Sequence, residues 1–103
     1  MSRIAQLEKL HAADPRDADV LYMLAQENAK LGDARAAVEW YDRCIATDPE
    51  YHYAYYHKAR SQEVLGEHPQ AIETLRAGLA RAETARNAKA VGEISAYIES
   101  LGG

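Results

Sequence analysis

The chain repeats itself at a nearly fixed spacing, and this period restricts its fold more than any other feature. The dipeptide Leu-Gly recurs after 34 and then 36 residues, and Asp-Pro recurs after 34 residues. When residues 18–51 are laid over residues 52–85, the matched pairs are Tyr22/Tyr56, Ala25/Ala59, Ala37/Ala71, Val38/Ile72, Glu39/Glu73 and Ile45/Leu79. Periods of this length are typical of stacked structural repeats, so the sequence predicts one unit copied along the chain.

Each unit contains two amphipathic helical patterns. In the first unit, one face carries Leu21, Leu24, Ala25 and Asn28, and the next helix carries Ala37, Val38, Tyr41, Cys44 and Ile45. Gly32 and Gly66 suit a helix C-terminus, Asp33 suits an N-cap, and Pro69 suits a first helical turn. These signals predict an all-α fold with about six helices, at residues 2–13, 18–31, 34–47, 52–65, 68–83 and 88–101.

These residues resemble the tetratricopeptide repeat (TPR) family, whose units are 34-residue antiparallel helix pairs. The matching small positions are Ala25 and Ala59, Ala37 and Ala71, and Cys44 and Gly78; Pro15 and Pro49 match the terminal proline. The resemblance implies an α-solenoid of antiparallel helix pairs that forms a right-handed superhelix. It also implies that the first helix of each unit lines the concave side.

The same frame divides the whole chain as one domain, residues 1–103. Residues 1–17 form a half repeat, 18–51 and 52–85 form two repeats, and 86–103 form a capping helix. The last helix fits only if two residues are inserted around residues 82–87, because strict register would bury Lys89 and Glu93. In the shifted register, Val91, Ile94 and Ile98 face the core, and Asn87 becomes the N-cap.

Charge and composition exclude several function classes. The net charge of −4 arises in residues 1–57, with six Lys/Arg against ten Asp/Glu, so no basic face is available for nucleic acid. The start of the chain has no continuous apolar run, which argues against a signal peptide, a membrane span or a membrane partner. With its single cysteine, Cys44, the chain has no CxxC pair. We expect a soluble, cytoplasmic protein without a cofactor.

The stretch "YHYAYYHK", residues 51–58, holds four of the seven tyrosines. Tyr55 matches Leu21 and is predicted to pack in the core, whereas Tyr51 is predicted in the turn between units. The other face of these helices is predicted to bind a partner through Tyr22, Met23, Gln26, Lys30, Tyr53, Tyr56, His57, Arg60 and Lys89. Aromatic side chains with polar tips and an arginine are typical of protein interfaces.

Other interpretations remain open for parts of this set. The tyrosines could instead fill space between first helices, with Tyr22 stacked on Tyr56. A metal site is disfavoured because His52 and His57 are five residues apart, and Cys44 suits an inert packing position. The family's clamp for chaperone C-terminal carboxylates would place Lys, Asn, Asn, Lys and Arg where this chain has Tyr22, Gln26, His57, Lys89 and Glu93. Only Lys89 agrees.

The sequence therefore predicts a non-catalytic protein–protein interaction module that binds a peptide or a segment of a partner protein in a concave groove. No catalytic grouping of residues stands out, so an enzyme is not expected. The alternative is a self-associating assembly protein that forms homo-oligomers. His57 in the groove predicts an affinity that changes between about pH 5 and 8.

Overall fold

The computed structural model describes residues 2–103 and contains six α-helices in that range. They are α1 (Arg3–Ala13), α2 (Ala18–Lys30), α3 (Ala34–Thr47), α4 (His52–Val64), α5 (His68–Thr84) and α6 (Ala88–Ser100). No expected helix end differs from these bounds by more than one residue. The predicted all-α architecture is confirmed.

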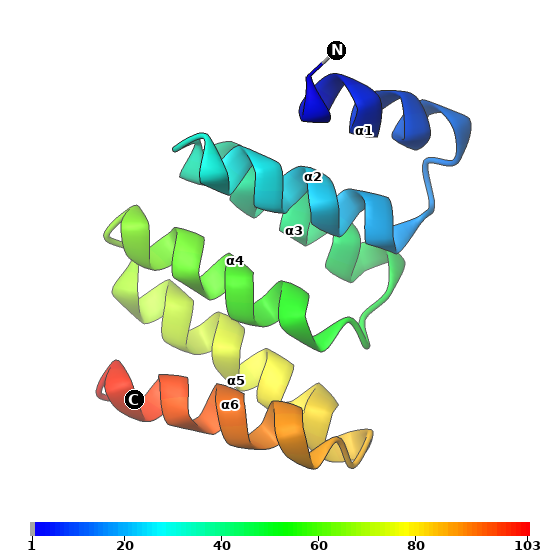
Figure 1. The fold of residues 1–103 in the computed structure, drawn as a ribbon. Helices are drawn as coiled ribbons and strands as arrows, with labels where there is room; N and C mark the ends of the chain where they lie inside the picture. Colours follow the sequence, from blue (N-terminus) through cyan, green and yellow to red (C-terminus); the bar gives the residue numbers. More distant parts are fainter. Residues whose placement is uncertain (1) are drawn as a thin grey trace.

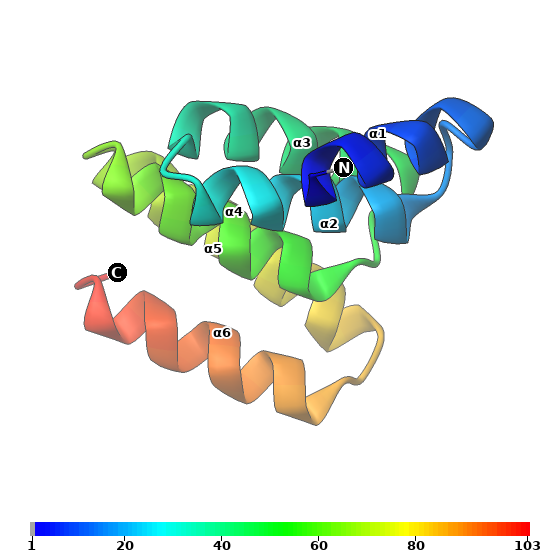
Figure 2. The same ribbon diagram turned by 45° about the horizontal axis from the view of Figure 1, so that its top comes forward.

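The helices stack in chain order into an elongated array of 41 × 29 × 18 Å. Each helix packs on its neighbour in sequence, and α4 also contacts both α2 and α6. The helices α2, α4 and α6 lie side by side in one layer, with α3 and α5 behind them (Figures 1 and 2). This is the predicted α-solenoid of antiparallel helix pairs.

Local signals place the helix ends as expected. The side chains of Asp33 and Asn87 accept hydrogen bonds from the backbone N–H groups of the third residue after each, and so cap α3 and α6. Gly32 and Gly66 follow α2 and α4 with φ of +84° and +78°. Side chains rarely tolerate this left-handed conformation, which explains the repeated Leu-Gly motif.

In the core, small residues occupy the helix–helix contacts, and large side chains pack beside these contacts. Ala25, Ala59, Ala37 and Ala71 are all fully buried. Tyr55 is 6% exposed, and its hydroxyl group donates a hydrogen bond to the carbonyl oxygen of Pro49 at 2.8 Å. Its ring lies against Gly78, where no side chain would fit. The predicted packing role of Tyr55 is confirmed.

The last helix, α6, follows the shifted register. Ile94 and Ile98 are buried and Lys89 is exposed, as the two-residue insertion predicts. Val91, however, is only half-buried, and Ala90 occupies the fully buried position beside it. The difference arises because α6 is the last helix of the stack, and packs only on α4 and α5.

Candidate partner-binding site

The predicted binding residues lie on the layer formed by α2, α4 and α6. Four come from α2, four from α4, and Lys89 comes from α6. Lys30, Arg60 and Lys89 are exposed, and the other six are half-buried: Tyr22, Met23, Gln26, Tyr53, Tyr56 and His57. The layer therefore offers both aromatic surface and charge to solvent.

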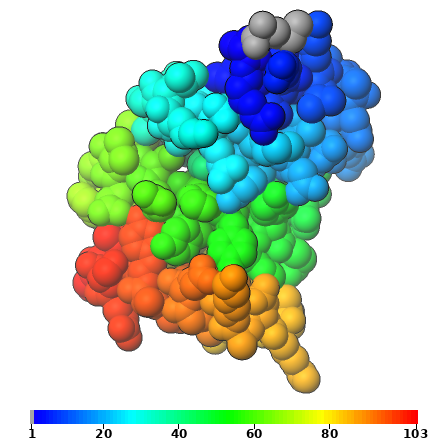
Figure 3. All heavy atoms as spheres, viewed as in Figure 1, coloured from blue at the N-terminus to red at the C-terminus, as the bar shows by residue number. Residues whose placement is uncertain are grey.

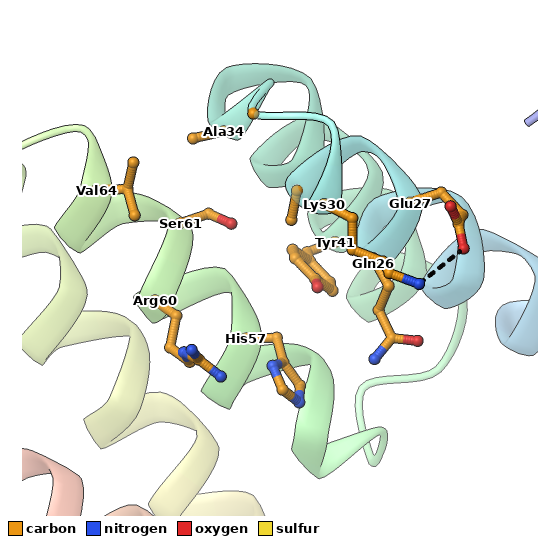
Figure 4. A pocket seen from close by; sticks show the side chains of 11 residues that line it. Gln26, Glu27, Lys30, Ala34, Tyr41, His57, Arg60, Ser61 and Val64 are labelled. Carbon is orange, nitrogen blue, oxygen red and sulfur yellow. Dashed lines mark ion pairs between the residues drawn. The ribbon is translucent and has the colours of Figure 1, made fainter.

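A pocket of about 520 Å³ opens between α2 and α4, and α3 forms its floor (Figures 3 and 4). We call it the α2–α4 pocket. The residues that line it are Gln26, Glu27, Ala29, Lys30, Gly32, Ala34, Tyr41, His57, Arg60, Ser61 and Val64. Four of the nine predicted residues are among them: Gln26, Lys30, His57 and Arg60.

Aromatic rings run across the layer beside this pocket. Tyr22 stacks on Tyr51 with ring centroids 4.8 Å apart, and its edge meets His57 at 5.8 Å. His57 in turn meets Tyr56 at 5.3 Å, and Tyr56 lies 5.0 Å from Tyr97 of α6. These rings pack on one another between the helices, as the space-filling alternative requires, although His57 rather than Tyr56 contacts Tyr22.

Hydrogen bonds hold several of these rings in place. Tyr51 lies just before α4, as the turn prediction required, and its hydroxyl group donates to Asp19 at 2.7 Å. The Gln26 amide donates to the hydroxyl oxygen of Tyr22 at 3.2 Å, and the Tyr97 hydroxyl donates to Glu63 at 2.5 Å. The aromatic surface is thus largely preorganised. Sequence reasoning did not assign Tyr97 to this surface.

The remaining predicted residues lie outside the α2–α4 pocket. Met23 lies towards α1, where its sulfur accepts a hydrogen bond from Arg3 at 3.5 Å. Tyr53 lies towards α6 and donates a hydrogen bond to Glu93 at 3.4 Å. Lys89, on α6, does not line the pocket either. The structure therefore brings together only part of the predicted set.

Only some of the charged side chains around the pocket form ion pairs. Glu27 is the one acidic side chain that lines it, and its carboxylate lies 3.6 Å from both Lys30 and Arg3. Within residues 2–103, no carboxylate forms an ion pair with Arg60. Figure 4 shows Arg60 and His57 on the wall of the pocket opposite Gln26 and Lys30. The α4 wall thus carries a positive charge that has no ion-pair partner among the described residues.

Burial sets the protonation states in the pocket. Desolvation, followed by the nearby charge of Arg60, lowers the pKa of His57 below its ordinary value of 6.5. Desolvation also raises the pKa of Tyr41, with a smaller contribution from Tyr22. At neutral pH the imidazole is therefore mostly uncharged, and the Tyr41 hydroxyl keeps its proton.

The lowered pKa of His57 predicts a pH-dependent stability. In the unfolded chain His57 takes up a proton near pH 6.5, whereas in the folded chain it does so only at a lower pH. The contribution of the neutral imidazole to the free energy of unfolding is therefore complete above pH 6.5 and is lost as the pH falls below it. The rings of Tyr22, Tyr41 and Tyr56, together with the charge of Arg60, surround the imidazole. Urea unfolding at several pH values from about 7.5 to 5 should show a larger loss of stability for the wild type than for His57→Gln. Equal losses in the two proteins would contradict this assignment.

Within residues 2–103, no group of three or more His, Cys, Asp or Glu side chains is arranged to hold a metal ion. Burial, together with the charges of Asp48 and Asp19, raises the pKa of Cys44 to about 12, so its thiol stays protonated and unreactive. None of the described helices has the length and apolar character needed to cross a membrane.

Residues 2–103 fold into six stacked helices with the α2–α4 pocket in one layer. This arrangement defines a helical-repeat protein of the α-solenoid class. The family model described as anaphase-promoting complex, cyclosome, subunit 3, which is of the tetratricopeptide repeat type, matches residues 2–78. Since this match covers more than half of the chain, the chain belongs to this family of TPR proteins. The predicted resemblance is confirmed.

Solved structures agree with this assignment. A tetratricopeptide repeat domain protein from Salinibacter ruber is 31% identical, with a TM-score of 0.79 over 85% of this chain and 89% of that chain. The TPR2B domain of yeast Sti1, in complex with pHsp70, is 25% identical, with a TM-score of 0.89 over 96% and 79%. PcrH, in complex with the chaperone-binding region of PopD, has a TM-score of 0.88 over 95% and 74%; at 19% identity it supports the fold alone. No curated protein matches the sequence.

Proposed function

We propose that this protein is a non-catalytic interaction module that binds a peptide segment of a partner protein on the layer of α2, α4 and α6. The observation that carries the proposal is the α2–α4 pocket, which lies beside a preorganised row of aromatic rings. Rigid aromatic side chains provide contact area at little cost in side-chain entropy, and arginine orients a ligand through its hydrogen bonds. The TPR2B domain of yeast Sti1, whose structure was solved in complex with pHsp70, supports a partner-binding role for this fold.

The partner is proposed to differ from a chaperone C-terminal tail. Of the five positions of the family's carboxylate clamp, this chain matches only Lys89, and Glu93 stands where the clamp has an arginine. Glu93 also accepts a hydrogen bond from Tyr53, so it is held in the layer as an acceptor. A carboxylate would be repelled at that position.

The repeat organisation belongs to the same proposal. Residues 18–51 and 52–85 are the two complete units, residues 1–17 correspond to a half unit, and residues 86–103 correspond to a capping helix. In support, α1 packs on α2 and α3 packs on α4. The capping helix contributes Tyr97 to the aromatic row.

An affinity capture from native lysate, followed by mass spectrometry, tests the binding layer. We expect Tyr56→Ala/Arg60→Glu to lose partners that the wild type retains, because the variant removes aromatic contact area and reverses the charge of the pocket wall. Arg76→Glu is the matched control, since Arg76 is exposed on α5 in the opposite layer. Circular dichroism should show that each variant is folded. Partners retained equally by both variants would contradict the proposed site.

Self-assembly is the second candidate, and one observation favours it. Leu10 is a large apolar side chain that is 52% exposed on α1, and a second copy of the chain would cover it. In that case light scattering should report a mass that rises with concentration, and Leu10→Lys should abolish the rise. A monomeric mass at every concentration would exclude self-assembly and leave the peptide-binding proposal untouched.

A further inference from the structure

Two residues that are otherwise buried present their hydroxyl groups to the α2–α4 pocket. Tyr41 is 1% exposed and Ser61 is 5% exposed, and both line the pocket. Neither hydroxyl group forms a hydrogen bond with any of residues 2–103, whereas Tyr51, Tyr55 and Tyr97 each donate one. Neither hydroxyl oxygen is among the buried side-chain atoms that lack a partner, so both are open to the pocket and can donate to a ligand that supplies an acceptor.

The charge beside these hydroxyl groups also favours an anionic acceptor. Arg60 lies one residue before Ser61 on α4 and has no carboxylate partner within the described chain, while Glu27 across the pocket is already paired with Lys30 and Arg3. The raised pKa of Tyr41 keeps its hydroxyl group a donor. Two hydroxyl donors and a guanidinium group match the lone pairs and the charge of a carboxylate.

The other end of the pocket is apolar. Ala29, Ala34 and Val64 line it, and Val64 is 78% exposed although it is a large aliphatic residue. Figure 4 shows Ala34 and Val64 on the side of Ser61 that faces away from His57. A ligand that satisfies both ends therefore has an apolar group close to its carboxylate.

We propose that the α2–α4 pocket binds the side-chain carboxylate of a Glu or Asp residue within the partner peptide, through Arg60, Tyr41 and Ser61, with a neighbouring apolar residue against Val64 and Ala34. This inference rests on the proposed function and specifies its ligand. It uses residues outside the five positions of the family's C-terminal carboxylate clamp. The proposed ligand is thus an acidic residue inside the partner peptide and not its C-terminus.

The test begins with selection of displayed random ten-residue peptides, joined to the display protein at their C-termini so that no free carboxylate is present there. We expect the selected peptides to share an acidic residue next to an apolar one. Each selected sequence is then synthesised with blocked ends in two forms, with Glu or with the isosteric Gln. Replacing Glu by Gln should weaken binding about tenfold or more, as expected for a hydrogen-bonded charge pair in a pocket.

Protein variants then locate the contact. Arg60→Gln and Tyr41→Phe should each weaken the Glu peptide severalfold and leave the Gln peptide nearly unchanged, whereas Arg76→Gln on α5 should affect neither. Equal affinity for the Glu and Gln peptides, or equal weakening of both by Arg60→Gln, would overturn the inference and leave the interaction function standing. A third form, the Gln peptide with a free C-terminus, completes the test. If the Gln peptide bound only in this form, the pocket would be assigned to terminal carboxylates and the inference would be overturned. Failure to select any peptide would contradict the inference and the proposed function together.

Discussion

Replacing Tyr41 by alanine is expected to lower the free energy of unfolding by about 3–5 kcal/mol, the usual cost of deleting a buried aromatic ring. Tyr41 is 1% exposed on α3, and its ring contacts Tyr22 at 5.9 Å and His57 at 6.4 Å between centroids. Its loss would leave a cavity below the α2–α4 pocket. Urea unfolding followed by circular dichroism measures the change.

Two phenylalanine variants separate the ring from the hydroxyl group. Tyr41→Phe should change stability by less than about 0.5 kcal/mol, because no described residue accepts a hydrogen bond from its hydroxyl. Tyr55→Phe should cost about 1 kcal/mol, since it removes the hydrogen bond to Pro49. If both variants lost the same stability, the Tyr41 hydroxyl would have a partner in the folded chain, and the carboxylate inference would lose one of its three donors.

Gly78→Ala is expected to destabilise the protein by about 1–3 kcal/mol, although alanine is the better helix former. A Cβ atom at Gly78 would lie 2.6 Å from the Cβ of Tyr55 and 2.9 Å from its Cγ. These atoms cannot rotate away, because they lie at the base of the side chain. The two helices α4 and α5 would therefore have to separate. Thermal or urea unfolding measures the loss.

Gly92→Ala on α6 is the matched control for Gly78→Ala. Apart from its chain neighbours and the backbone of its own helix, no atom lies within 4 Å of a Cβ built at Gly92, so this variant should stabilise the helix by about 0.5–1 kcal/mol. Effects of the same sign at the two glycines would refute the steric explanation. A second check is Tyr55→Leu/Gly78→Cys, which copies the Leu21 and Cys44 pair of the other unit and should recover much of the stability lost in Tyr55→Leu alone.

The layer that carries the candidate site could be predicted from the sequence, but the pocket could not. Gln26, Lys30, His57 and Arg60 share the outward face of their helices, and helical periodicity was enough to group them. Tyr41 and Ser61 belong to buried positions, so the same periodicity assigns them to the core. Their accessibility to a ligand depends on the separation of α2 and α4 above α3.

By itself the sequence determined the all-α solenoid and its helix ends, because these depend on local signals and on contacts between neighbouring helices. The caps at Asp33 and Asn87, the left-handed Gly32 and Gly66, and the 34-residue period all act within one unit or between adjacent units. Only the tertiary structure decided which side chains meet across α2, α3 and α4. These side-chain contacts depend on ring orientations and on hydrogen bonds between residues far apart in the chain, such as Tyr51 with Asp19. No local sequence pattern encodes them.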